Sequence, residues 1–204
     1  MSKFTKGLLL VLSSPSGGGK TTVVNKLLKI HPEFTLSVSA TTRPSRKKEK
    51  HGVDYFFLSD SEFDGRIDYG DFVEWAWVYN YRYGTLKSII EKGLSKDKII
   101  LLNTDVQGAE SIKKAYPNST VRVFILPPSK EELEKRLRNR GSDSLESIET
   151  RLQNSLKEVQ EALKFDYLVI NHDLKKCVAL VEKIIFVELY RPYRVAPLEG
   201  WEFD

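Results

Sequence analysis

Apolar runs recur along the chain, with helical patterns between them, and the first of them is continuous. The first, GLLLVLS at residues 7–13, leads through SPSGGGKTT into the helical pattern VVNKLLKI. Further runs lie at residues 99–102, 121–126 and 167–170. A run that is apolar at every position is typical of a strand buried on both faces, and its alternation with helices predicts a parallel sheet covered on both sides. We therefore expect an α/β fold with three layers.

Residues 37–94 break this alternation. They contain aromatic and β-branched stretches such as VDYFFLS and DFVEWAWVYNYRYG, which are punctuated by glycines. This composition favours strands and turns. We predict a small β-rich insertion at residues 37–94 and a core formed by residues 1–36 and 95–204. Within the insertion, Trp75 and Trp77 are expected to belong to the core or to the wall of a pocket.

A charged helical segment follows Pro127 and Pro128, which should end the strand before it. Ser129 is the predicted N-cap of this helix, and Glu132 three residues later would complete a capping box. Residues 136–151 then include the polar stretch GSDSLESIE, which offers little to bury. We expect this segment to be mobile.

Composition is consistent with one compact domain. The chain has 204 residues, of which 41% are hydrophobic. The apolar run at residues 7–12 is too short to span a membrane and is not followed by a small-residue cleavage site, so we expect a protein without a signal peptide or a membrane partner. The single cysteine, Cys177, lies in an apolar helical pattern and is predicted to be a small buried hydrophobe. A reducing cytoplasm fits this cysteine usage best.

The formal net charge of +4 raises the question of nucleic-acid binding. Basic residues are spread along the chain beside 28 acidic ones, and the densest basic cluster is confined to residues 43–50. Binding to a polynucleotide would need a continuous basic face with stacking aromatic side chains. We therefore expect no nucleic-acid partner, and we interpret the cluster as a solvated loop or as a site for a small anion.

A phosphate-binding loop is predicted at residues 13–22, SSPSGGGKTT. Gly19, Lys20 and Thr21 match the end of the pattern G-x-x-x-x-G-K-[ST], whereas Ser14 replaces its first glycine. If Ser14 adopts the backbone angles of that glycine, the strain would cost about 1 kcal/mol. The glycines let backbone N–H groups converge on a phosphate, Lys20 would hold the β and γ phosphates of ATP, and the Thr21 hydroxyl would bind Mg²⁺. The predicted ATP-binding residues here are Ser16, Gly17, Gly18, Gly19, Lys20, Thr21 and Thr22.

Several later motifs resemble those of guanylate kinases. The segment SVSATTRPSRKKEKHGVDYFFLS is similar to their pattern S-x-S-x-T-T-R-x-x-R…G-x-D-Y-x-F, and the similarity continues through EFDGRIDYGDFVEWAWVYNYRYGT, DVQG, PPSKEELEKRLRNRG and LVINHD. This resemblance covers nearly the whole chain. It implies a P-loop NTPase fold with a GMP-binding insertion and an arginine-bearing helical lid at about residues 136–151. It also implies Mg²⁺-dependent transfer of the terminal phosphate of ATP to GMP or dGMP.

The resemblance assigns the acceptor site by position. Two arginines and three hydroxyl groups would hold the GMP phosphate, because guanidinium groups bind a dianion in two-pronged hydrogen bonds. They are Ser39, Arg43, Arg46, Tyr55 and Tyr83. Glu74 and Thr85, with Asp105 nearby, would bind the base, since an ionised carboxylate accepts from guanine N1–H and N2–H₂ whereas adenine has an acceptor at N1.

The resemblance also assigns the lid and the adenine end. Arg136, Arg140 and Arg151 match lid arginines that fold over the ATP phosphates, and Asn171 would lie near the adenine. Lys20, Arg43, Arg140 and Arg151 are the predicted catalytic residues, because guanidinium and ammonium groups stabilise the charge on a migrating phosphoryl group. For Arg136, an ion pair with Glu132 on its own helix is the alternative. Asn103 stands where the family commonly has a carboxylate, so the predicted metal site rests on Thr21.

Two other functions stay open at this level. A catalytically silent guanylate-kinase-like module could bind a phosphopeptide, and a related kinase could act on another acceptor. Glu74 with Thr85 favours guanine, and Lys20, Thr21 and the arginines favour an enzyme. The sequence leaves both a monomer and a homo-oligomer open.

Overall fold

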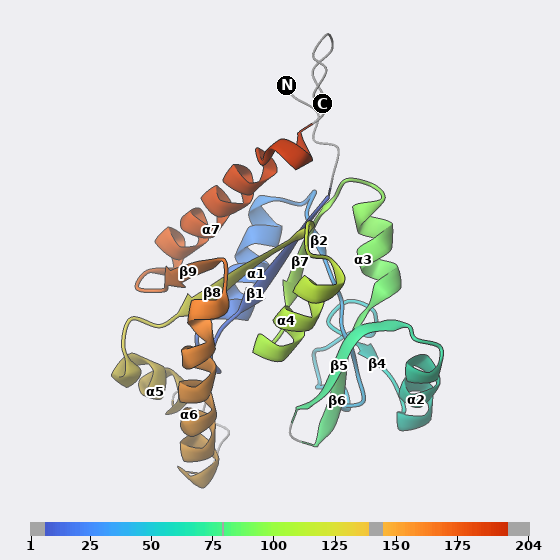
Figure 1. Cartoon of the computed structure of the whole chain (residues 1–204). Coiled ribbons are helices and arrows are strands. Elements are labelled where there is room, and N and C mark those ends of the chain that lie inside the picture. Colours follow the sequence, from blue (N-terminus) through green and yellow to red (C-terminus); the bar gives the residue numbers. More distant parts are fainter. Residues whose placement is uncertain (1–6, 79, 139–144, 196–204) are drawn as a thin grey trace.

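The computed structural model describes residues 7–78, 80–138 and 145–195 (Figure 1). Its core is a five-stranded sheet in which every neighbouring pair is parallel. In spatial order the strands are β2 (Thr35–Leu36), β7 (Ile99–Asn103), β1 (Leu8–Ser13), β8 (Thr120–Leu126) and β9 (Tyr167–Ile170). The predicted strand runs and the α/β class are therefore confirmed.

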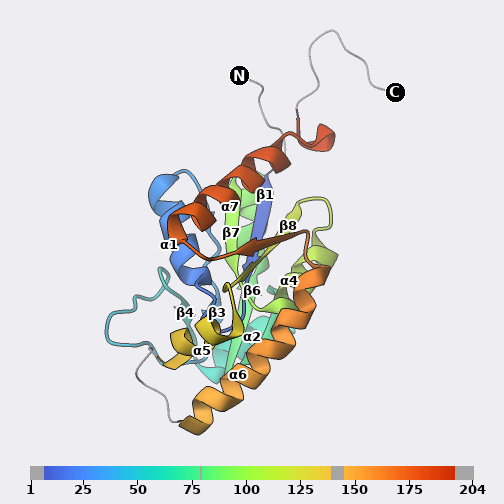
Figure 2. The ribbon, with the colours of Figure 1, turned by 90° about the vertical axis from the view of Figure 1, so that its left-hand side faces the viewer.

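Helices cover both faces of this sheet (Figures 1 and 2). On one face α1 (Lys20–Ile30) and α7 (Leu174–Leu189) pack against alternate residues of β1, such as Leu10. On the other face α3 (Lys87–Leu94) and α4 (Val106–Ala115) pack against residues such as Val11. Because β1 is buried on both sides, all of its residues lie out of water, which explains its continuous apolar run. Cys177 is buried in the α7 face as predicted, and burial raises the pKa of its thiol to about 11.

The predicted insertion forms a second sheet. Its strands, in spatial order, are β4 (Phe56–Phe57), β3 (Ala40–Thr41), β6 (Tyr81–Leu86) and β5 (Phe72–Val78). A helix, α2 (Asp60–Asp68), packs Phe63 against Phe72, with the two ring centroids 4.5 Å apart. This helix begins at Ser59 with a complete capping box formed with Glu62. Besides these strands, residues 37–94 contain the helices α2 and α3.

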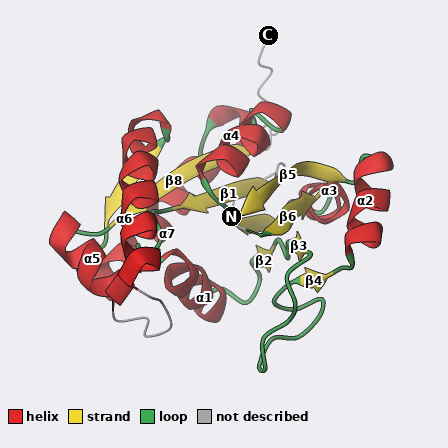
Figure 3. Ribbon diagram, turned by 90° about the horizontal axis from the view of Figure 1, so that it is seen from below, coloured by secondary structure: helices red, strands yellow, loops and turns green. Residues whose placement is uncertain are grey.

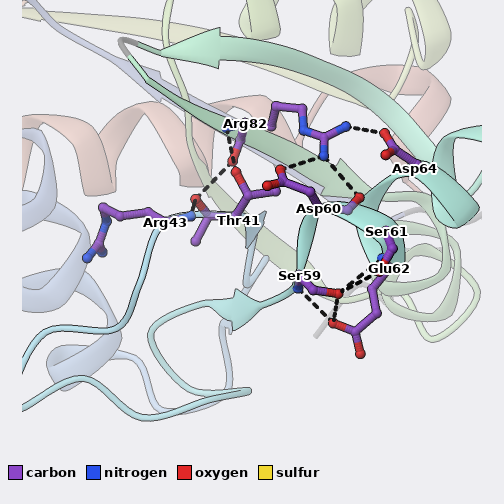
Figure 4. Close-up of polar contacts among 9 residues, drawn as sticks. Thr41, Arg43, Ser59, Asp60, Ser61, Glu62, Asp64 and Arg82 are labelled. Carbon is purple, nitrogen blue, oxygen red and sulfur yellow. Dashed lines mark hydrogen bonds and ion pairs between the residues drawn. The ribbon is translucent and has the colours of Figure 1, made fainter.

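Figure 4 shows how Arg82 fastens α2 to β6. Its guanidinium donates to the carboxylates of Asp60 and Asp64, and it lies 4.8 Å from the ring centroid of Phe63 and 5.5 Å from that of Trp77. The arginine side chain is buried although both carboxylates are exposed. A charge held between two rings and two carboxylates gives the insertion its own fixed geometry.

The prediction that Trp75 and Trp77 lie in the core or in a pocket wall is wrong. Their exposed fractions are 41% and 61%. They lie on the outer strand of the small sheet, which has no partner on one side among the described strands. Trp77 stacks on Arg82 instead, so the aromatic pattern indicated a strand but not a buried one.

The segment that follows β8 contains α5 (Lys130–Arg138) and α6 (Leu145–Gln160). Ser129 accepts a hydrogen bond from the N–H of Glu132, so the predicted N-cap is confirmed. The Glu132 carboxylate, which was expected to complete a capping box, pairs with Arg136 instead. Leu133 and Leu137 pack against Leu152. Residues 139–144, part of the segment predicted to be mobile, lie outside the described residues. The 3₁₀ turns η1 (Glu161–Lys164) and η2 (Pro192–Arg194) complete the described elements.

Seen from below, the insertion and the α5–α6 pair lie on opposite sides of the molecule, with β1 and α1 between them (Figure 3). No helix among the described residues is long and apolar enough to cross a membrane.

Candidate active site

The loop between β1 and α1 has the geometry that phosphate binding requires. Gly17 and Gly19 have φ angles of 90° and 97°, a region that favours glycine. Ser14 has no such angle, because the one non-glycine residue with positive φ in the described chain is Asp97, so the predicted strain at Ser14 is absent. Gly19 is the N-cap of α1 and makes no side-chain capping bond, which leaves the first N–H groups of the helix available to an anion.

Lys20 lies at the start of α1, with its ammonium group directed at the end of β7. The Nζ atom donates to the carbonyl oxygen of Thr104 at 2.7 Å. Burial lowers the pKa of Lys20 to about 8, while the carboxylates of Asp105 and Glu158 act in the opposite direction. The loop therefore holds a partly desolvated cation between two acids, a place suited to a charged ligand.

Thr21 is the candidate metal ligand. Its hydroxyl accepts a hydrogen bond from Asn103 Nδ2 at 3.3 Å, across the gap between α1 and the end of β7. Hydroxyl and amide oxygens are hard donors of the kind that Mg²⁺ prefers. No group of three or more histidine, cysteine or acidic side chains that could hold a metal occurs among the described residues. The residues present thus fit an ion that takes most of its ligands from phosphate and water.

A cavity of about 420 Å³ joins this loop to the insertion. The loop and α1 contribute Ser16, Gly17, Gly19, Lys20, Thr21 and Thr22 to its lining. The insertion contributes Ser39, Tyr55, Glu74 and Tyr83, and the N-cap of α4 contributes Asp105. The structure therefore brings together most of the residues that the sequence assigned to two substrates. Gly18 is buried beside them.

Glu74 and Thr85, which the sequence assigned to the base, contact each other. Thr85, which is 3% exposed, donates its hydroxyl to Glu74 Oε1 at 2.5 Å across the β5–β6 pairing. Burial raises the pKa of the Glu74 carboxyl; the Thr85 hydroxyl opposes this shift and nearby Asp105 adds to it. Asp105 is also the N-cap of α4, where it accepts from the N–H of Gly108 at 2.8 Å.

Arg43 and Arg46, the two arginines predicted to bind the acceptor phosphate, both contact Glu49. Arg43 Nη2 donates to both oxygens of Glu49 at 2.9 Å, and Nη1 donates to the carbonyl oxygen of Pro44 at 2.8 Å. Burial lowers the pKa of Arg43, but its hydrogen bonds outweigh this effect and raise it. Arg46 is exposed and donates its main-chain N–H to Glu49. In the described part of the chain, neither arginine is among the residues that line the cavity.

Thr41 fixes the main chain that carries Arg43. Its hydroxyl accepts from the N–H of Arg43 at 3.1 Å and donates to the carbonyl oxygen of Arg82 at 2.9 Å (Figure 4). Thr41 is fully buried. The same network that anchors the insertion therefore sets where Arg43 leaves β3.

Of the three predicted lid arginines, the structure describes the side chain of Arg136 alone. Arg136 makes the ion pair with Glu132 that was its alternative, at 2.8 Å, and also donates to the carbonyl oxygen of Asn171 at 3.2 Å. Asn171 donates its amide to the carbonyl oxygen of Gly18 at 3.1 Å and so braces the phosphate loop from behind. Arg140 lies outside the described residues. Arg151 belongs to α6, but its side chain also lies outside them.

Sequence reasoning missed Glu158. It comes from α6 and lines the cavity together with Ser16 and Lys20. Burial raises the pKa of its carboxyl, against the attraction of Lys20. No local motif marks this glutamate; the one available signal was its position two helical turns after Arg151, on the same face of α6.

A glycine-rich loop that opens into one cavity with polar side chains of an inserted sheet is the arrangement expected of a nucleoside monophosphate kinase of the P-loop class. The family model described as guanylate kinase matches residues 6–188. The chain therefore belongs to the guanylate kinase family, whose members use ATP to phosphorylate GMP.

Curated relatives and a solved structure agree with this. The chain is 42% identical to the guanylate kinase of Myxococcus xanthus over 190 residues, covering 93% of this chain and 90% of the relative. It is also 42% identical to that of Thermotoga maritima over 180 residues, covering 88% and 86%. The crystal structure of guanylate kinase from Anaplasma phagocytophilum superposes with a TM-score of 0.79 at 33% identity, covering 96% of this chain and 92% of that one.

Proposed function

We propose that the cavity binds ATP at the phosphate loop and GMP or dGMP at the insertion, so that the γ-phosphate passes directly to the acceptor phosphate. One observation carries this proposal: Glu74, which accepts the Thr85 hydroxyl, lines the same cavity as Lys20. GMP and dGMP share the base edge that Glu74 would read, which supports both as acceptors.

The residues of the cavity would position the two substrates and neutralise the charge of their phosphates. The attacking oxygen is an ionised phosphate, so no general base is required. Loop N–H groups and Lys20 would hold the donor phosphates, while Ser39, Tyr55 and Tyr83 would hold the acceptor phosphate together with Arg43 and Arg46. Arg43 would exchange Glu49 for that phosphate, since both present two oxygens to one guanidinium.

Mg²⁺, when bound through Thr21, would neutralise the phosphate oxygens of ATP. Around it the protein supplies backbone donors and a fixed ammonium, which stabilise charge without reorganisation during the reaction. We infer that residues 37–94 and the arginine-bearing segment at about residues 136–151 approach each other when both substrates bind. Closure would place Arg136, Arg140 and Arg151 at the phosphates and exclude water, which would otherwise hydrolyse ATP.

The proposed cellular location rests on the cysteine and on the substrates. We infer a cytoplasmic enzyme, because its single cysteine is a buried free thiol and its substrates ATP and GMP are small molecules. The partners proposed are these substrates alone, without nucleic acid or membrane.

A coupled ADP-release assay with ATP and Mg²⁺ tests the proposal when GMP, dGMP, AMP, UMP and CMP are offered in turn. We expect turnover with GMP and dGMP and little with the others. Lys20→Ala should abolish turnover, whereas Lys26→Ala, an exposed lysine two turns further along α1, should leave it near normal. Turnover with AMP in preference to GMP would refute the base assignment, and near-normal turnover in Lys20→Ala would refute the assignment of the phosphate loop.

A silent binding module is the second candidate, and Glu49 on Arg43 is the observation that favours it, because a carboxylate already fills that arginine. A folded protein that binds GMP but releases no ADP with any acceptor would support the module.

A further inference from the structure

Glu158 reaches the phosphate loop from a distant part of the chain. It lies near the C-terminal end of α6, the helix that packs against α5, and its carboxylate lines the cavity that holds Lys20. It also lines a second cavity of about 520 Å³ between α4 and α6, together with Asp105 and Glu161. Glu158 therefore stands where the two cavities meet.

The neighbours of this carboxylate are groups that a nucleotide phosphate would use. It lines one cavity together with Ser16 and Lys20, and the ammonium group of Lys20 attracts its charge. Loop N–H groups and this lysine are the groups that a P-loop offers to phosphate oxygens. A carboxylate is an anion with the same capacity to accept charge-assisted hydrogen bonds.

We propose that Glu158 serves as the counter-ion of Lys20 in the empty enzyme, and that the phosphates of ATP must take its place beside this lysine. The proposal rests on the assignment of this loop to ATP. A phosphate and the carboxylate would compete for the ammonium group of Lys20, and two anions held close together in a partly desolvated site repel each other. Binding of the donor therefore includes the loss of the Glu158 contacts.

This exchange has two consequences for the reaction. Glu158 lowers the affinity of the loop for ATP and ADP, because the empty state is stabilised by a counter-ion of its own. Its return after transfer would assist release of ADP. Since Glu158 and Arg151 belong to the same helix, occupancy of the loop and the position of α6 are also linked.

The test is a calorimetric titration of the whole chain with inorganic pyrophosphate, and in parallel with ATP. Glu158→Gln removes the charge and keeps the shape of the side chain. We expect pyrophosphate to bind about tenfold more tightly to this variant, which corresponds to about 1.4 kcal/mol. Glu158→Ala should shift binding in the same direction, which guards against a result peculiar to the glutamine amide.

Glu161→Gln is the matched control. Glu161 lines the outer cavity and pairs with Lys164 at 2.6 Å, so the variant removes the same charge without touching the phosphate loop. Pyrophosphate affinity should change less than about twofold in this control, because the charge is solvated.

The outcomes separate the inference from the function on which it rests. Unchanged or weaker pyrophosphate binding in both Glu158 variants would overturn the inference and leave the ATP assignment intact. Equal tightening in Glu161→Gln would overturn it as well, because the effect would then come from overall charge. Pyrophosphate that binds neither the original chain nor the variants would overturn both the inference and the ATP assignment.

Discussion

Replacement of Glu74 by glutamine should separate binding of the base from stability of the fold. The carboxylate is partly buried and accepts the Thr85 hydroxyl at 2.5 Å. Burial raises the pKa of Glu74, and Asp105 adds to the shift. The protein therefore keeps an acid in a place that disfavours its charge, as expected of a group retained for a ligand.

The size of the binding loss follows from the guanine edge. Ionised Glu74 can accept from two donors, N1–H and N2–H₂, and each hydrogen bond to a charged group contributes about 1.5–3 kcal/mol. Glutamine keeps one neutral acceptor and turns an NH₂ group toward the other donor. We expect a loss of about 3 kcal/mol, which lowers kcat/KM for GMP roughly 150-fold at about 1.36 kcal/mol per decade.

The effect on stability should have the opposite sign. An acid whose pKa is raised by folding contributes stability below its unfolded pKa, and this contribution is lost as the pH rises through the folded value. Glutamine does not titrate, so the variant should be at least as stable as the original chain at neutral pH. Its advantage should disappear as the pH falls below the pKa of an unfolded glutamate, about 4.3.

Steady-state ADP release with GMP and AMP measures the first effect, and thermal unfolding at neutral and acidic pH measures the second. Thr85→Ser keeps the hydroxyl and is the matched control, with GMP turnover expected within a few-fold of normal. A fall of less than about tenfold in kcat/KM for Glu74→Gln, or a clearly lower melting temperature at neutral pH, would refute the reasoning.

Three further changes test other parts of the structure. Gly19→Ala should weaken ATP binding at least about tenfold in calorimetric titration, because φ is 97° and the new Cβ would lie 2.7 Å from Asn171 Nδ2. Gly65→Ala is the control: no atom lies within 4 Å of its new Cβ, so this variant should bind ATP normally. Arg82→Lys should lower the free energy of unfolding by about 1–3 kcal/mol in urea denaturation, because lysine cannot contact two carboxylates in the same plane; an unchanged midpoint would contradict the role given to that clamp. Burial lowers the pKa of His31, but its hydrogen bonds to Glu182 at 2.5 Å and to Glu33 outweigh burial and raise it. The stability that His31 adds should be present below its unfolded pKa, about 6.5, and should be lost as the pH rises through the folded value. The measurement is the unfolding free energy of the original chain minus that of His31→Ala. A difference that grows with pH would show the sign to be wrong.

The sequence by itself determined the elements whose cause is local. A strand buried on both faces is apolar at every position, so β1 could be recognised from its run, and shorter apolar runs marked β7, β8 and β9. The phosphate loop could be recognised because its glycines, Lys20 and Thr21 act within a few residues of each other. Most of the acceptor residues followed from motifs in order, and the cavity brings Ser39, Tyr55, Glu74 and Tyr83 together.

Tertiary structure decided what depends on register and docking. Between Phe72 and Glu74 the pairing of β5 with β6 shifts, which turns Glu74, Ala76 and Val78 toward the cavity and leaves Trp75 and Trp77 exposed on the outer strand. An alternating pattern cannot reveal such a bulge, because one extra residue exchanges the two faces.

Contacts between distant segments were equally invisible. Asn171 braces Gly18, and Glu158 reaches Ser16 and Lys20, only because β9 and α6 fold back over the loop. A glutamate on a charged helix has the same local sequence whether it faces water or a buried ammonium group. Its role is set by what the rest of the chain places in front of it, and that is determined by the packing of the whole molecule.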